Sequence, residues 1–352
     1  MSAFLLDYGL FLAKTLTLLL ALVAAVVVIG SAIAAGRREA SPRPRLRHLN
    51  QLIEQRRAAL EDQVLEGGPA LKAARRQRKQ AAKARAKAAH RQPRPRLFVL
   101  DFTGDLQASA VTSLREEISC VVGLARPGDE VLLRLESPGG LVHGYGLAAS
   151  QLVRLRRHGL PLTVAVDKVA ASGGYLMACV ASRIVAAPFA ILGSIGVVAQ
   201  IPNVHRLLKK NDVDVELHTA GAYKRTLTVL GENTEAGRAK FREELEDTHR
   251  LFQEFVAEHR PVLDLATVAT GEHWFGQRAL ALKLVDELAT SDDWLLRHLD
   301  SHEVYELQCP RRRRLGERLG ERLRAWLGAA PEDLAALRLP RLQGADPDQL
   351  RF

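Results

Sequence analysis

The stretch Val169–Ser182, VAASGGYLMACVAS, places one serine before two glycines at the expected start of a helix. Free amides and the dipole at a helix N-terminus favour negative charge. Ser172 is therefore a candidate nucleophile, and the same helix end could hold the oxyanion that forms when it attacks a carbonyl. The competing interpretation is an N-cap, because serine is among the residues preferred at that position. The local sequence leaves both interpretations open.

A nucleophilic serine needs a base. His205 is the best-placed histidine, but nothing in its basic, helical surroundings marks it as oriented. A lysine can serve instead, because burial lowers its pKa and leaves a neutral amine. Lys224, in GAYKRTLT, follows an expected buried strand and has the small residues Gly221 and Ala222 beside it.

Two glycine turns follow expected buried strands, ESPGG at 136–140 and the turn that contains Ser172. Open α/β sheets place their sites in the loops outside the carboxyl ends of strands. Glycines in such loops let backbone N–H groups approach a ligand closely. We therefore expect the chemistry at these two turns.

Short apolar runs alternate with helical patterns from Leu97 onward, which predicts an α/β domain with largely parallel strands. We expect strands at 96–102, 130–136, 161–167, 182–188 and 213–219. We expect helices at 109–125, 145–159, 172–181, 203–210 and 234–259. Before this domain, residues 50–65 can form a polar helix and residues 70–89 a helix or a disordered arm, with Gly67, Gly68 and Pro69 between them.

The 21 residues Thr15–Ala35 carry no charge and predict a membrane-spanning helix. A cleaved signal peptide is the alternative, but its apolar region usually runs only about 7–15 residues. Arginines follow the segment closely, at 37, 38, 43, 45 and 47. By the positive-inside rule, the body then lies in the cytoplasm.

The net charge of +10 is concentrated outside the expected globular body. Residues 72–96 hold 11 Lys or Arg and no acid, whereas residues 97–310 hold 21 basic and 28 acidic residues. The basic segment lacks aromatic residues for base stacking, so we expect membrane lipid and no nucleic acid as its partner. The three cysteines have no metal-ligand spacing and read as small apolar core residues.

Four motifs together resemble the signal peptide peptidase A family of membrane serine peptidases, and the N-terminal half resembles its SohB branch. They are ESPGG, VAASGGYLMACVASRIVAAPFAILGSIGV, GAYKRTLT and GEHWFGQRALALKLVDEL, within Leu97–Leu288. The resemblance implies a ClpP/crotonase-like α/β fold of repeated β-β-α units, preceded by one N-terminal transmembrane helix and a basic helical spacer. It also implies serine endopeptidase activity without metal or cofactor.

Carried over by motif, the resemblance assigns Ser172 as nucleophile and Lys224 as general base. It implies an oxyanion hole from the amides of Gly139, Gly140 and Gly173, and a hydroxyl at Ser194 that orients the lysine. Arg225 departs from the family, in which serine often follows the lysine.

We expect a transmembrane anchor at 1–36, a charged spacer at 37–96, the peptidase domain at 97–300 and a basic amphipathic tail at 301–352. The resemblance implies peptide or unfolded-protein substrates, a homo-oligomeric ring or dome, and the bacterial inner membrane. It allows a periplasmic body, whereas the charge bias favours a cytoplasmic one. Three alternatives stay open: a Ser-His-Asp peptidase of ClpP type using His205, a crotonase-type acyl-CoA enzyme, and a non-enzymatic membrane scaffold.

Overall fold

The computed structural model describes residues 8–23, 44–65, 68–91 and 94–310. They belong to two compact units, of which the first includes residues 8–23 and the second spans Arg43–Arg311. Residues 8–23 form a helix with exposed, large apolar side chains. No helix within the described ranges is both long and apolar enough to cross a membrane. Residues 24–35 of the expected span and the tail from 311 lie outside the described residues.

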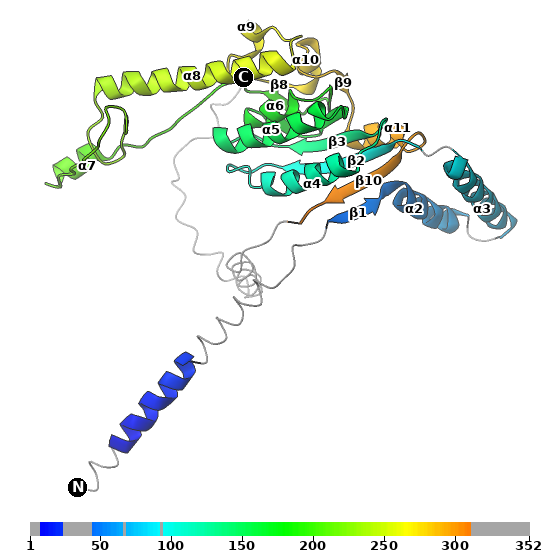
Figure 1. Ribbon diagram of the computed structural model, residues 1–352, viewed down its shortest axis with the longest axis horizontal. Helices are drawn as coiled ribbons and strands as arrows, with labels where there is room; N and C mark the ends of the chain where they lie inside the picture. The colour runs from blue at the N-terminus through cyan, green and yellow to red at the C-terminus, as the bar shows by residue number, and fades with distance from the viewer. Residues whose placement is uncertain (1–7, 24–43, 66–67, 92–93, 311–352) are drawn as a thin grey trace, which may run out of the picture. The chain divides into compact units, whose positions relative to one another are not determined.

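The second unit is built on a seven-stranded sheet in the order β1, β10, β2, β3, β4, β6, β9 (Figure 1). All its neighbouring strands are parallel except β1 and β10. A second sheet has the order β5, β7, β8, with β8 antiparallel to β7. The strands are β1 Arg45–His48, β2 Arg96–Thr103, β3 Glu130–Glu136, β4 Leu162–Val166, β5 Val169–Ala171, β6 Arg183–Ala186, β7 Ile191–Gly193, β8 His273–Phe275, β9 Glu287–Leu288 and β10 Glu303–Gln308.

Helices cover both faces of the large sheet. The main core lies between one face and the helices α4, α5 and α6, and Leu100, Leu133 and Tyr145 are among its members. On the other face, Leu49 and Trp294 pack against Leu97 and Leu132. The helices are α2 Leu49–Val64, α3 Gly68–Arg91, α4 Val111–Leu124, α5 Val142–Arg157, α6 Gly173–Ala178, α7 His205–Lys210, α8 Glu235–His259, α9 Leu265–Val268, α10 Gly276–Ala281 and α11 Ser291–His298.

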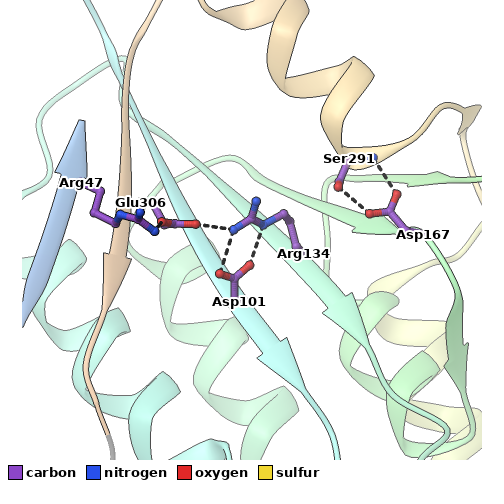
Figure 2. Close-up of polar contacts among 6 residues, drawn as sticks. All are labelled: Arg47, Asp101, Arg134, Asp167, Ser291 and Glu306. Carbon is purple, nitrogen blue, oxygen red and sulfur yellow. Dashed lines mark hydrogen bonds and ion pairs between the residues drawn. The ribbon is translucent and has the colours of Figure 1, made fainter. Parts of the chain in front are cut away.

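A polar network on the second face joins strands that are distant in sequence. Figure 2 shows Arg134 of β3 donating to both carboxylate oxygens of Asp101 on β2, at 2.6 and 2.8 Å, and to Glu306 of β10 at 2.5 Å. Arg47 of β1 donates to the other Glu306 oxygen at 3.2 Å. The network holds β10 beside β2, so residues 303–308, which we expected in the tail, lie in the sheet of the body.

The expected α/β class with a parallel sheet is confirmed, and most expected elements are present within a few residues of their predicted ends. The strand expected at 213–219 is wrong. Those residues are exposed and irregular. Their alternation of apolar and polar residues suits a sheet edge, but no described strand pairs with them.

Candidate active site

Ser172 stands between β5 and α6 in a backbone conformation that serine rarely adopts. Its φ is 51° and its ψ is −120°, a region that costs a residue with a Cβ about 1–3 kcal/mol. Its N–H donates to the Gly193 carbonyl at 2.8 Å, which anchors the turn to β7. Its side chain makes no capping hydrogen bond to α6. Ser172 therefore occupies the N-cap position of α6, as one interpretation expected, but its hydroxyl is not used to cap the helix.

The ESPGG loop lies directly against this turn. A Cβ added to Gly139, whose φ is 91°, would lie 2.8 Å from the Gly173 nitrogen and 2.8 Å from the Ser172 Cβ. A Cβ on Gly140 would lie 2.3 Å from the Leu106 carbonyl oxygen. Both positions therefore require glycine, and the two turns predicted to carry the chemistry do meet.

The three predicted oxyanion donors differ in their hydrogen bonds. The Gly139 N–H already donates to Ser137 Oγ at 3.1 Å. The N–H groups of Gly140 and Gly173 have no hydrogen-bond acceptor among the residues that the structure describes. Both glycines line the same cavity as Ser172. In this conformation, Gly140 and Gly173 supply the open amides beside the nucleophile.

The cavity beside Ser172 has a volume of about 370 Å³. Its lining is mostly apolar, and four of its 15 lining residues belong to α8, which the sequence predicted as a helix but not as part of a site. The larger side chains in the wall include Val142, Leu176, Val197, Val198, Thr248, Leu251, Phe252 and Phe255. Such a cavity fits an apolar group next to the atom that Ser172 would attack.

Ser194 lies beside the Ser172 turn. It directly follows Gly193, the residue whose carbonyl accepts the Ser172 N–H. Its φ is 50°, and its own N–H donates to the Glu272 carbonyl at 2.6 Å. The structure therefore brings Ser194 into the neighbourhood of the predicted nucleophile.

Lys224 is not part of this arrangement within one chain. Its side chain is exposed, it does not line the cavity, and its backbone N–H donates to the Gly221 carbonyl at 3.2 Å. His205, at the start of α7, does not line the cavity either. The structure thus joins Ser172 to the glycine turns and to Ser194, but not to either predicted base.

A different histidine, on α8, lies near the site without reaching it. His249 Nε2 lies 3.2 Å from the Ile195 carbonyl oxygen, one residue beyond Ser194. It does not line the cavity, and no sequence signal singles it out. Asp167 lies just before β5, the strand that leads to Ser172, and accepts hydrogen bonds from the N–H and Oγ of Ser291 (Figure 2). This environment gives a Ser-His-Asp arrangement no support.

No described group of three or more His, Cys, Asp or Glu side chains is placed to hold a metal ion. The Ser172 hydroxyl and the open amides of Gly140 and Gly173 lie at the cavity, and the Ser194 hydroxyl belongs to the segment beside the Ser172 turn. They suit attack on a carbonyl with the oxyanion held by the amides.

Comparison with protein families gives two adjacent matches. Residues 3–152 match the N-terminal region of peptidase family S49, and residues 154–304 match peptidase family S49 itself. Similar proteins named "Probable protease SohB" occur in Haemophilus influenzae, with 63% identity over 224 residues, and in Buchnera aphidicola subsp. Schlechtendalia chinensis, with 63% identity over 205 residues.

The alignment covers 64% of this chain and 64% of the Haemophilus protein, and 58% of this chain and 67% of the Buchnera protein. Among solved structures, the membrane-bound stomatin-specific protease 1510-N is similar over 58% of this chain and 84% of its own, with 13% identity and a TM-score of 0.40.

Proposed function

Because this chain belongs to peptidase family S49, we propose that it is a serine endopeptidase with Ser172 as the nucleophile. The observation that carries the proposal is the environment of Ser172. The residue is held at a positive φ, is not engaged in capping α6, and adjoins the amides of Gly140 and Gly173 at an apolar cavity. Strain of this kind concentrates at functional sites.

In the proposed reaction, neutral Lys224 removes the Ser172 proton and the oxygen attacks a peptide carbonyl. The backbone amides hold the oxyanion of the tetrahedral intermediate, for which one donor typically contributes about 2.7–4 kcal/mol. The lysine then protonates the leaving amine, and water hydrolyses the acyl-enzyme. Ser194 orients the lysine. The surrounding ClpP/crotonase-like fold supplies the two glycine turns.

The exposed position of Lys224 is a chemical reason to expect a homo-oligomer. A lysine acts as a base only when burial or neighbouring charge lowers its pKa. Within one chain the Lys224 side chain is exposed and lies outside the cavity. We therefore propose that the chain assembles into a ring or dome, in which residues 199–231 of one copy cover the Ser172 cavity of the next.

We propose a single-pass anchor at the bacterial inner membrane, formed by the uncharged segment Thr15–Ala35. The arginines that follow it favour a cytoplasmic body. The basic helix α3 would contact lipid, because Leu71, Ala74 and Arg78 are partly buried while Lys72, Arg76, Lys79 and Lys83 are exposed. Successive members of the exposed set are three or four residues apart, which places them on one stripe of the helix.

The proposed substrates are signal-peptide remnants and fragments of misfolded or membrane proteins. The cavity beside Ser172 is apolar, and such segments are rich in apolar residues. A peptide chain would place one apolar side chain in this cavity while its carbonyl approaches the Gly140 and Gly173 amides.

Reaction of the purified full chain with a fluorophosphonate tests this function. We expect labelling of the wild type and of Lys224→Ala at different rates, no labelling of Ser172→Ala, and peptide hydrolysis that rises toward alkaline pH. A Ser172→Ala protein with full peptidase activity would refute the proposal. An acyl-CoA thioester as a parallel substrate tests the crotonase-type alternative.

A further inference from the structure

A chain of hydrogen bonds leads away from the ESPGG loop into the core. The Gly139 N–H donates to Ser137 Oγ at 3.1 Å, Ser137 Oγ lies 2.6 Å from Tyr145 Oη, and Tyr145 Oη donates to the Asp105 carbonyl at 2.9 Å. A carbonyl only accepts, so Tyr145 uses its single hydrogen there. Ser137 must then donate to Tyr145 and accept from Gly139. Only this direction satisfies every group.

The same two side chains also support the other side of the site. Ser137 and Tyr145 are fully buried. A Cβ on Gly173 would lie 2.4 Å from Tyr145 Cγ, so the tyrosine ring lies directly against this glycine. A Cβ on Gly174 would lie 2.5 Å from the Ser137 carbonyl oxygen. The Ser137–Tyr145 pair therefore contacts both turns that meet at Ser172.

We propose that Ser137 and Tyr145 are positioning residues for the oxyanion hole, and that Gly139 acts as its hinge and not as one of its donors. The inference rests on the proposed peptidase function. With its N–H held by Ser137 and its φ at 91°, Gly139 sets the orientation of the next peptide unit. That unit carries the Gly140 N–H, while the Tyr145 ring fixes the position of Gly173. The two donors keep their spacing because one buried pair holds both.

Tyr145→Phe removes the hydroxyl and keeps the ring. Ser137 then loses its acceptor and its hold on Gly139 weakens, so we expect kcat to fall about tenfold with KM within about twofold. Ser137→Ala should have a similar effect. The double variant should be about as slow as either single variant, because the chain of hydrogen bonds acts as a unit. The pH profile should keep its shape, because neither residue exchanges a proton with substrate.

Tyr175→Phe is the matched control. Tyr175 is also fully buried, and its hydroxyl donates to the Leu284 carbonyl at 2.9 Å, away from the ESPGG loop. We expect a comparable fall in Tm but unchanged kcat. A peptide aldehyde, which forms a tetrahedral adduct, should lose affinity for Tyr145→Phe in step with kcat/KM, whereas the corresponding peptide alcohol should not.

Full kcat in Tyr145→Phe, or equal losses of kcat in Tyr145→Phe and Tyr175→Phe, would overturn the positioning role while leaving the peptidase assignment intact. A wild type that neither hydrolyses peptides nor reacts with a fluorophosphonate would refute the proposed function, and the positioning role would fall with it.

Discussion

The Ser172 N–H donates to the Gly193 carbonyl at 2.8 Å, which ties the proposed nucleophile to a strand 21 positions later in the chain. Gly193 has a φ of 96°, and a Cβ there would lie 2.8 Å from the Trp274 ring. The carbonyl that holds Ser172 in its strained conformation therefore depends on a residue without a side chain.

Gly193→Ala should destabilise the fold by about 1–3 kcal/mol, because the backbone must leave its positive φ or the Trp274 ring must move. Ser172 would shift with it, and we expect kcat to fall at least about tenfold. Urea unfolding and peptide hydrolysis measure the two effects. The control is Gly123→Ala on α4, where a Cβ meets nothing within 4 Å. It should retain activity, and an inactive control or an active Gly193→Ala would contradict the argument.

Mixing two inactive variants tests where Lys224 acts. Ser172→Ala and Lys224→Ala should each be inactive alone. If one copy supplies the serine and its neighbour the lysine, an equal mixture reassembled from monomers should regain about one quarter of wild-type activity, by random pairing around a ring. No recovery, despite mixed assemblies seen by native mass spectrometry, would place both residues of each site in one chain.

The parts of the fold that sequence predicted well are those with a strong local signal. The strands β2, β3 and β4 are mostly apolar because both of their faces are largely buried. The helix α8 has an N-cap at Thr234 and an amphipathic pattern over its whole length. Burial and capping act within a few residues, so a local pattern reveals them.

The structural features that the sequence did not predict depend on residues far away in the chain. The strands β5 and β7 have three residues each, too few for a periodic pattern, and they exist because they pair with one another. β10 enters the sheet beside β2 from the far end of the body. The conformation of Ser172 depends on the Gly193 carbonyl, and the Gly139 N–H is hydrogen-bonded to Ser137. No local pattern encodes these contacts.

The apolar cavity predicts a substrate preference that one exposed position can change. Leu251 lines the cavity from α8 and is 60% exposed, so Leu251→Asp should fold normally. It should raise KM about tenfold for peptides with an apolar residue at the cleavage site, which corresponds to about 1.4 kcal/mol of binding. Leu296→Asp on α11, at a similarly exposed leucine outside the cavity, is the control. An unchanged KM for Leu251→Asp would exclude this cavity as the binding site for that residue.

We predict that the basic stripe of α3 contacts membrane lipid more strongly when the lipid headgroups are anionic. In proteoliposomes that contain phosphatidylglycerol, backbone amides of α3 should exchange hydrogen several-fold more slowly than in phosphatidylcholine, and about 0.5 M salt should reverse this by screening. Reversing the four charges at 72, 76, 79 and 83 should abolish the difference. Reversing four exposed body charges, at 115, 157, 210 and 278, should not. Equal exchange in both lipids would contradict the proposed contact.

Glu117 predicts how stability changes with pH. One of its carboxylate oxygens accepts the Cys309 N–H at 2.8 Å, and the other is buried without a partner among the described residues. Burial raises the pKa of this carboxyl to about 7 from an ordinary value of 4.5. The protonated form is thus favoured in the folded state, and its stabilising effect is complete below about pH 4.5 and is lost as the pH rises through 7.

Glu117→Gln removes this titration and keeps the shape of the side chain. Relative to that variant, the wild type should lose up to about 3 kcal/mol of unfolding free energy between pH 4.5 and 7, and little more above that range. Urea unfolding of both proteins across the range measures the difference. Glu116→Gln changes an exposed neighbour that water solvates. The pH dependence of its unfolding free energy should therefore differ far less from that of the wild type. A wild type that gains stability over Glu117→Gln as the pH rises would show that the folded protein favours the charged carboxylate.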